Sequence, residues 1–148
     1  MKALLVLSLI AVFSLFLACG EFNTDSKGSE VADSFATAYF NYDYHKSLKY
    51  VHPTSWKWIV YAASQVRQED VDMLRSMAEP PTIEIEEHTR DKVNDSLVYI
   101  TVKVSNFFNM DTIGTSGHMV QDARFSLPVL YAKGKWLVRL DELPRPIR

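Results

Sequence analysis

Residues 67–90, RQEDVDMLRSMAEPPTIEIEEHTR, change from one hydrophobic spacing to another, and this change decides the fold class. Before the two prolines, apolar side chains recur every three or four residues, which is typical of one face of a helix. After the prolines, Ile83 and Ile85 alternate with glutamates, which is typical of a half-buried strand. Proline ends a helix because it lacks the amide hydrogen. The sequence therefore predicts helices before this point and strands after it.

Helical spacing continues toward the N-terminus. Val31 and Phe35 lie four apart on one face of a helix that Ser29 is suited to cap. A second, short helix is predicted around Leu48. Pro53 then opens a third helix, because a proline in the first turn loses no hydrogen bond. The residues predicted on the inner face of that third helix are Trp56, Ile59, Val60 and Ala63.

Strand spacing continues toward the C-terminus. Residues 96–107, 118–132 and 135–143 each alternate apolar and polar side chains. Proline cannot donate to a central ladder, so we expect Pro128 at a bulge or at a sheet edge. Helices followed by a four-stranded antiparallel meander predict an α+β fold, with the helices packed on one face of the sheet.

The first residues have the pattern of an export signal. Lys2 precedes an uncharged run over residues 3–17, which is shorter than the ~20 residues that a membrane-spanning helix needs. Small residues follow the run on both sides of Cys19, as they do at signal cleavage sites. The alternative interpretation is a buried helix of the folded domain.

Residues 16–19, FLAC, resemble the lipobox of bacterial lipoproteins, and the match is good at its last two positions. The first two positions depart from the usual box and resemble the looser boxes of the Bacteroides group. The resemblance implies that the thiol of Cys19 carries lipid and that the chain is cut before it. It also implies an outer-membrane anchor facing the periplasm. The predicted organisation is a lipoprotein signal peptide (1–18), a lipidated cysteine with a flexible tether (19–28) and a single α+β domain (29–148).

Charge and cysteine content exclude several classes of function. The chain has 16 Lys and Arg against 18 Asp and Glu and contains no basic stripe, which argues against a nucleic-acid partner. Cys19 is its single cysteine, so the domain has no disulfide, no cysteine nucleophile and no cysteine metal ligand. His45 and His52 are seven residues apart and would not reach one ion from a straight helix. We predict no metal site and no cofactor.

Residues 38–56, AYFNYDYHKSLKYVHPTSW, resemble the opening of small cystatin-like, nuclear transport factor 2-like domains, and residues 133–138, KGKWLV, resemble their last strand. The resemblance covers residues 29–142 and implies three helices that close the mouth of a strongly curved sheet. Such cones often hold an apolar ligand. The expected aromatic lining is Tyr39, Tyr42, Trp56 and Tyr61; the alternative is that these side chains fill the cone as core.

Some proteins with this fold are enzymes, such as ketosteroid isomerase with its aspartate base and its tyrosine–aspartic acid oxyanion hole. The acid–base side chains available here are Asp43, His45, Tyr61, Asp122 and Asp141, and Asp122 is expected to pair with Arg124. None matches a family catalytic motif, so we assign no catalytic residue. The expected function is non-catalytic binding of a small apolar ligand or an envelope protein. The alternatives are an isomerase- or hydrolase-like enzyme on the same cone, and a structural module that forms a homodimer through its open sheet face.

Two short patterns, Asp95-Ser96-Leu97 and Asp111-Thr112-Ile113, resemble the sites at which exported Bacteroides proteins are O-glycosylated. Both fall in predicted turns, where a transferase could reach them. The resemblance implies modification at Ser96 and Thr112, although so short a pattern also arises by chance.

Overall fold

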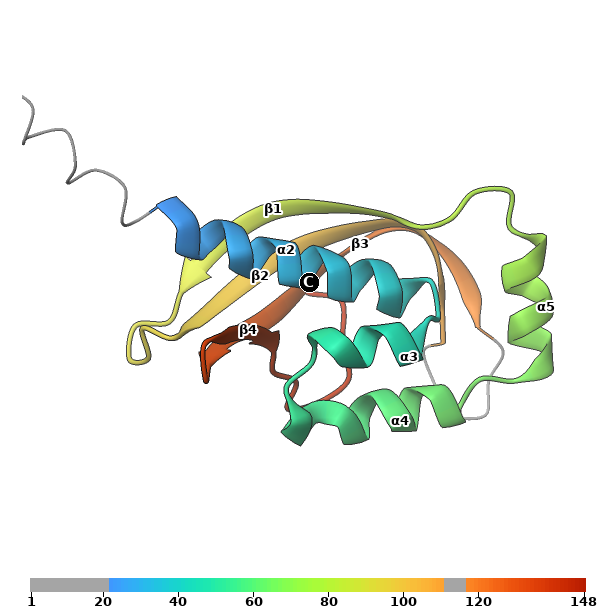
Figure 1. The fold of residues 1–148 in the computed structure, drawn as a ribbon. Helices are drawn as coiled ribbons and strands as arrows, with labels where there is room; N and C mark the ends of the chain where they lie inside the picture. The colour runs from blue at the N-terminus through green and yellow to red at the C-terminus, as the bar shows by residue number, and fades with distance from the viewer. Residues whose placement is uncertain (1–21, 111–116) are drawn as a thin grey trace, which may run out of the picture.

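The computed structural model describes residues 22–110 and 117–148, and its order of elements is helices first and strands second (Figure 1). The helical elements are α2 (Phe22–Phe40), α3 (Tyr44–Ser47), the 3-10 turns η1 (Leu48–Tyr50) and η2 (Pro53–Ser55), α4 (Trp56–Ser64) and α5 (Gln68–Ser76). The strands are β1 (Thr82–Arg90), β2 (Leu97–Asn109), β3 (His118–Ala132) and β4 (Lys135–Val138). The predicted α+β fold class is confirmed.

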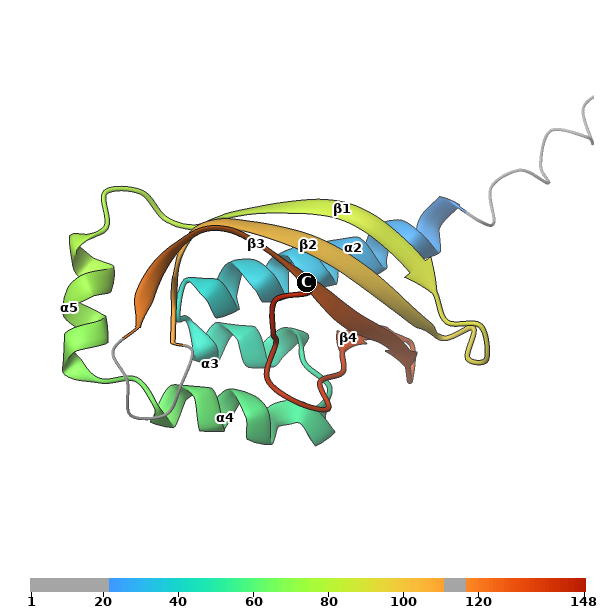
Figure 2. The same ribbon diagram turned by 180° about the vertical axis from the view of Figure 1, so that it is seen from behind.

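The four strands form one antiparallel sheet in the order β1-β2-β3-β4, which arches over α2 (Figures 1 and 2). A bulge between Ile85 and Glu87 interrupts the pairing of β1, and bulges bend and twist their strands. In β2, Asn106 has a left-handed backbone with φ of 56°. Past this residue two consecutive side chains, Phe107 and Phe108, are both buried instead of alternating. The bend therefore lets the end of β2 contribute side chains to the helical side of the sheet.

The hydrophobic core lies between α2 and the concave face of the sheet. Alternate residues of β2 point inward and are fully or almost fully buried, as are those of β3. The helix meets them with small and aromatic side chains on one face. The members of this core include Ala32, Phe35, Ala36, Val98, Ile100, Val102, Val104, Phe125, Leu127 and Val129.

The first helix begins at Phe22, seven residues before the predicted cap at Ser29, so the prediction of a flexible tether is wrong for residues 22–28. Glycine and serine have low intrinsic helix propensity, which is why this segment resembles a linker in sequence. Packing on the sheet supplies the missing stability. A Cβ on Gly28 would lie 3.6 Å from Cδ1 of Ile100 and 3.9 Å from the ring of Trp136. The helix thus lies close to the sheet at Gly28.

The orientation of α4 differs from the predicted one. Its buried residues are Ile59 and Ala62, whereas Val60 is 60% exposed and Ala63 is also exposed. The 3-10 turn η2 precedes α4 and rotates the helix about its axis, so different residues face inward. Ser55 fixes this turn in place. The Ser55 hydroxyl donates to the carbonyl of Leu140 at 2.9 Å and accepts from its amide at 2.8 Å.

The last predicted strand, 135–143, ends early, at Val138, and residues 139–148 form a C-terminal tail. The amide of Arg139 donates to the carbonyl of Pro128 at 2.8 Å. In an antiparallel strand the backbone nitrogen and oxygen of one residue point toward the same neighbouring strand. The nitrogen of Pro128 therefore points toward Arg139, just past the end of β4, where no ladder hydrogen bond has to be donated. The prediction offered a bulge or a sheet edge, and Pro128 lies on the inner strand β3, at the local edge where its pairing with β4 stops. Farther on, the amide of Ile147 donates to the carbonyl of Arg124 at 2.8 Å, which returns the tail to β3.

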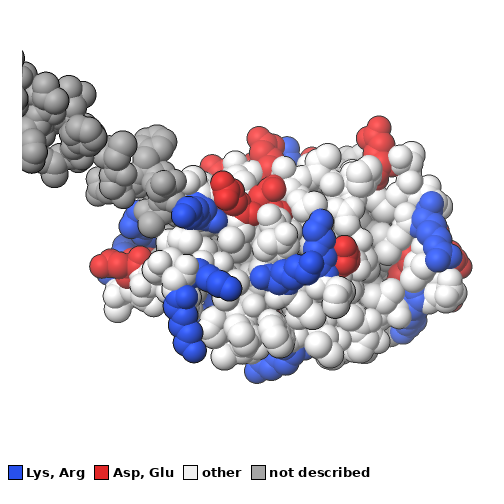
Figure 3. All heavy atoms as spheres, viewed as in Figure 1, with Lys and Arg blue, Asp and Glu red and all other residues white. Residues whose placement is uncertain are grey.

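Within residues 22–110 and 117–148, no helix is both long and apolar enough to cross a membrane. Acidic and basic side chains both occur on the face shown in Figure 3, and no continuous basic stripe crosses it.

Candidate functional site

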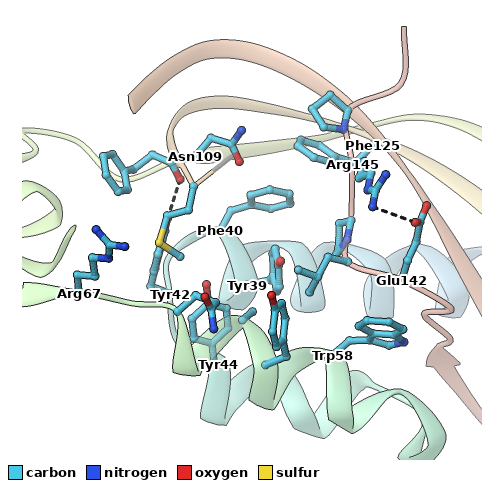
Figure 4. A pocket seen from close by; sticks show the side chains of 18 of the residues that line it. Tyr39, Phe40, Tyr42, Tyr44, Trp58, Arg67, Asn109, Phe125, Glu142 and Arg145 are labelled. Atoms are coloured by element: carbon cyan, nitrogen blue, oxygen red, sulfur yellow. Dashed lines mark hydrogen bonds and ion pairs between the residues drawn. The ribbon is translucent and has the colours of Figure 1, made fainter. Parts of the chain in front are cut away.

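A pocket with a cavity volume of about 890 Å³ opens between the end of α2, α3, α4 and the C-terminal tail (Figure 4). The end of β2 and the middle of β3, at Phe125, close its sheet side. Most of its inner wall is aromatic, and the outer wall includes charged side chains. The residues that define it are Tyr39, Phe40, Tyr42, Tyr44, Trp58, Tyr61, Ala62, Gln65, Arg67, Phe108, Asn109, Met110, Phe125, Glu142, Leu143, Pro144, Arg145, Pro146 and Arg148. We call this the aromatic pocket.

The way α2 ends places Tyr42 in the wall. The amide of Tyr42 bonds to the carbonyl of Tyr39 at 3.0 Å, and that of Asp43 bonds to the carbonyl of Ala38 at 2.9 Å. These two bonds form a Schellman motif, whose left-handed position is usually glycine. Here it is Tyr42, with φ of 63°. The turn directs its ring across the pocket, where the hydroxyl donates to the carbonyl of Phe108 at 3.0 Å.

Neighbouring rings hold one another in this wall. The rings of Tyr39 and Tyr44 meet edge to face with centroids 5.5 Å apart, and Tyr44 lies 5.6 Å from Tyr42. Phe35, in the core, stacks on Tyr39 at 5.4 Å. Such contacts between rings each stabilise a protein by ~0.5–1.5 kcal/mol beyond the burial of area. The wall is therefore continuous with the hydrophobic core on one side and open to the pocket on the other.

Burial raises the pKa of the Tyr39, Tyr42 and Tyr44 hydroxyls well above the usual value of 10.0. The negative charge of Asp70 raises the pKa of Tyr42 and Tyr44 further. All three phenols therefore remain protonated near neutral pH and can donate hydrogen bonds. Tyr42 uses its proton on Phe108, whereas the hydroxyls of Tyr39 and Tyr44 have no hydrogen-bond partner among the described residues.

The structure brings three of the four expected lining residues together. Tyr39, Tyr42 and Tyr61 line the aromatic pocket. Trp56 does not: it is 47% exposed, and its indole nitrogen donates to the carbonyl of Val51 at 3.2 Å. Trp58 takes its place, because the shifted phase of α4 turns the second tryptophan inward. Among the described residues, the Trp58 Nε1 is a buried donor without a hydrogen-bond partner.

The charged part of the wall is mainly basic. Arg67 precedes α5, and Arg145 and Arg148 lie in the C-terminal tail. Glu142 is the acidic member of the wall, and its carboxylate lies 3.4 Å from the Arg145 guanidinium. Figure 4 shows Arg67 at one margin of the pocket and the Arg145–Glu142 pair at the opposite margin.

The acid–base residues considered for catalysis lie apart from one another. Tyr61 lines the pocket, but Asp43 is an exposed cap whose carboxylate accepts from the amide of Lys46 at 3.0 Å. His45 and Asp141 are exposed. The structure does not bring these side chains together, and in the part of the chain that it describes, no three potential ligands form a metal site.

The expected ion pair between Asp122 and Arg124 is wrong. Arg124 donates to Glu86 through two nitrogens of its guanidinium group, at 2.6 and 2.9 Å; Glu86 is the bulged residue of β1, and the pair reaches across β2. Asp122 accepts from the hydroxyl of Ser105 at 2.6 Å and lies 3.8 Å from the Lys103 ammonium.

Sequence reasoning missed Asp70, a buried carboxylate whose charge raises the pKa of Tyr42 and Tyr44. It is 4% exposed and accepts from the amide of Arg67 at 2.8 Å, so it caps the start of α5. The signal was present in the sequence as an acidic residue in the first turn of a helix. Its burial came from tertiary packing, which the pattern does not encode.

The predicted modification sites are only partly within the described residues. Ser96 is half-buried in the turn between β1 and β2, where its amide donates to the side chain of Asn94 at 3.0 Å and its carbonyl accepts from Tyr131 at 2.8 Å. Cys19 and Thr112 lie outside the described residues.

Comparison with known proteins gives one likeness to report. No family model and no curated protein matches the chain. A matching solved structure is described as an "Ntf2 like protein involved in plasmid conjugation"; it is 16% identical, with a TM-score of 0.35. The match covers 80% of this chain and 47% of that one, so this chain spans about half of that protein's length. The helices and the four-stranded antiparallel sheet are those of the predicted α+β arrangement.

Proposed function

We propose that this chain is a lipid-anchored protein of the bacterial envelope that binds a small, largely apolar ligand in the aromatic pocket without transforming it. The observation that carries the binding proposal is the pocket itself. Its volume of about 890 Å³ falls within the ~300–1,000 Å³ of typical ligand sites, and its lining combines eight aromatic side chains with six polar or charged ones. The curved fold also fits such a module.

The position of the core supports an open pocket over a filled cone. Protein interiors are close-packed, with few voids larger than a water molecule. The closely packed cluster lies between α2 and the sheet, and it ends at Phe40 and Phe125, which also line the pocket. The core thus packs without using the space beyond these two rings. That space is large enough for a ligand, and the hydroxyls of Tyr39 and Tyr44 in its wall can donate hydrogen bonds to one.

Native mass spectrometry tests the binding proposal directly. The chain would be extracted gently from the envelope of the cell that makes it, and we expect an additional, reproducible mass on it. Ala62→Phe, which fills the pocket from α4, should remove this mass, whereas Ala63→Phe, one residue away and exposed, should retain it. If Ala62→Phe fails to fold, Gln65→Trp narrows the same wall from a half-buried position. A bare parent chain, or a mass that both pocket variants retain, would refute the proposal.

The lipid anchor rests on the sequence of residues 1–19, and its test is independent of the pocket. We expect metabolic labelling with an acyl chain to modify the parent chain and not Cys19→Ala, which should remain unprocessed or be released. A labelled Cys19→Ala variant would exclude the lipobox interpretation. Resistance of the parent chain to protease added to intact cells would support the proposed periplasmic face of the outer membrane.

A dimerising module is the second function that the fold fits. On the outer sheet face, Tyr99 is 37% exposed and stands opposite Pro128, and Leu130 pairs with Leu137 beside them. This apolar area is where two copies could meet. It adjoins the charged pair of Arg124 with Glu86 on the same face, which limits its extent.

A further inference from the structure

We infer that the ligand of the aromatic pocket is an amphipathic anion, with an apolar body against the aromatic wall and one acidic oxygen group, such as a carboxylate or a phosphate, beside Arg67. This inference rests on the proposed binding function and gives it a ligand class.

The first support is the charge of the pocket wall. The chain as a whole is acidic, with a formal net charge of −2, yet the wall contains three arginines and one glutamate. Glu142 is paired with Arg145 at 3.4 Å. The guanidinium groups of Arg67 and Arg148 have no acidic partner in the part of the chain that the structure describes. Even if the buried charge of Asp70 offsets one arginine, the pocket keeps a positive excess.

The second support is the kind of polar atom that the wall leaves unused. The hydroxyls of Tyr39 and Tyr44 remain protonated and have no partner among the described residues. Trp58 Nε1 is a buried donor without a partner, and an indole nitrogen can only donate. A buried donor left unpaired is costly. Oxygen acceptors on the ligand would satisfy the donors that they reach, whereas a pure hydrocarbon would satisfy none. Trp58 lies on the side of the Arg145–Glu142 pair in Figure 4, so a group beside Arg67 would leave its indole nitrogen to another polar atom of the ligand.

The third support is the placement of Arg67. Its backbone amide donates to the Asp70 carboxylate at 2.8 Å, which fixes the main chain at the start of α5. Among the described residues its guanidinium group has no ion-pair partner. In Figure 4 this side chain lies at the margin next to Tyr42, opposite the Arg145–Glu142 pair. Arginine presents a planar fork that matches carboxylate and phosphate geometry. We therefore assign the acidic end of the ligand to the Arg67 margin.

A matched pair of small probes tests the inference. 1-Naphthaleneacetate and 1-naphthaleneacetamide have nearly the same shape, but the first is an anion and the second is neutral. Isothermal titration calorimetry would compare their binding to the full chain in nanodiscs of neutral lipid. We expect the anion to bind roughly tenfold more tightly, a difference that corresponds to about 1.4 kcal/mol.

Variants then locate the acidic end. Arg67→Gln should remove the preference for the anion by lowering the anion's affinity far more than the amide's, and the variant should still fold because the helix cap uses the backbone of this residue. Arg75→Gln removes the same charge from the exposed surface of α5, outside the pocket, and should change nothing. Arg145→Gln should have a smaller effect, since that side chain is already paired.

Each outcome has one meaning. Equal binding of the two probes, blocked by Ala62→Phe, would overturn the anion inference and leave the proposed binding function standing. A preference that survives Arg67→Gln but not Arg145→Gln would overturn the assignment of the acidic end. Failure of both probes to bind would count against the binding function itself, and the inference would fall with it.

Discussion

Exchanging Tyr42 for alanine or glycine tests the left-handed helix end that forms one wall of the aromatic pocket. Both variants lose the bond from the hydroxyl to Phe108, which contributes about 1 kcal/mol. They also lose the packing of a half-buried ring, about half of the ~3–5 kcal/mol that a fully buried one contributes. Tyr42→Ala should therefore be roughly 2.5–3.5 kcal/mol less stable than the parent chain.

The order of the two variants is the decisive result. At φ of 63°, alanine bears the left-handed penalty of about 1–2 kcal/mol. Glycine avoids it but loses roughly 0.5–1 kcal/mol through its greater freedom in the unfolded chain. Tyr42→Gly should therefore be more stable than Tyr42→Ala by about 0.5–1 kcal/mol. In a right-handed helix the order is the reverse, with alanine favoured by about 1 kcal/mol.

Urea unfolding followed by circular dichroism would measure these free energies, provided that the slope with denaturant is the same for each variant. Ala38→Gly, inside α2 and buried, is the matched control and should lose about 1 kcal/mol or more. If Tyr42→Ala proves as stable as Tyr42→Gly, or more so, the helix does not end in a Schellman motif at Tyr42 and the reasoning about the pocket wall fails.

Three further predictions follow from other parts of the structure. Ser55→Ala should lower the free energy of unfolding by about 1–3 kcal/mol, because it leaves the buried backbone of the tail without partners; a change below about 0.5 kcal/mol in urea unfolding would contradict this. Burial raises the pKa of Tyr39 and Tyr44, so the folded state binds their protons more tightly. The free energy of unfolding should therefore be level below the ordinary pKa of 10.0 and fall as the pH rises above it, and part of the phenolate absorbance should appear only together with unfolding; absorbance that is complete before unfolding would contradict this. Tyr99→Lys should convert the chain to monomers if the outer sheet face forms a dimer; analytical ultracentrifugation that finds the parent and the variant equally monomeric removes that alternative.

The strands were predictable because their local pattern and their tertiary environment agree. The bounds of β1 match the predicted ones because Ile83 and Ile85 alternate with charged residues on an edge strand. The position of Pro128 at an edge followed from a backbone property that no packing can change. These features depend on the residue itself and on its nearest neighbours along the chain.

The errors arose where distant contacts override local preference. Residues 22–28 resemble a linker, and the sheet beneath Gly28 makes them helical. Trp56 and Trp58 are equivalent by hydrophobicity, and the choice between them depends on the phase of α4, which is set by the bonds between Ser55 and Leu140. The basic margin of the pocket was also hidden, because Arg67 and Arg145 are far apart in sequence.

The bonds between Ser55 and Leu140 join positions 85 residues apart, and they have a consequence for how the pocket forms in time. Contacts between distant positions carry a high entropic cost of loop closure and form late in folding. The sheet, whose strands pair with their neighbours in sequence, can assemble first, while the wall made by the tail waits for the last ten residues. A bound ligand that contacts this wall would stabilise the docked tail. Ligand binding should therefore slow the detachment of the tail from the fold more than the detachment of any strand.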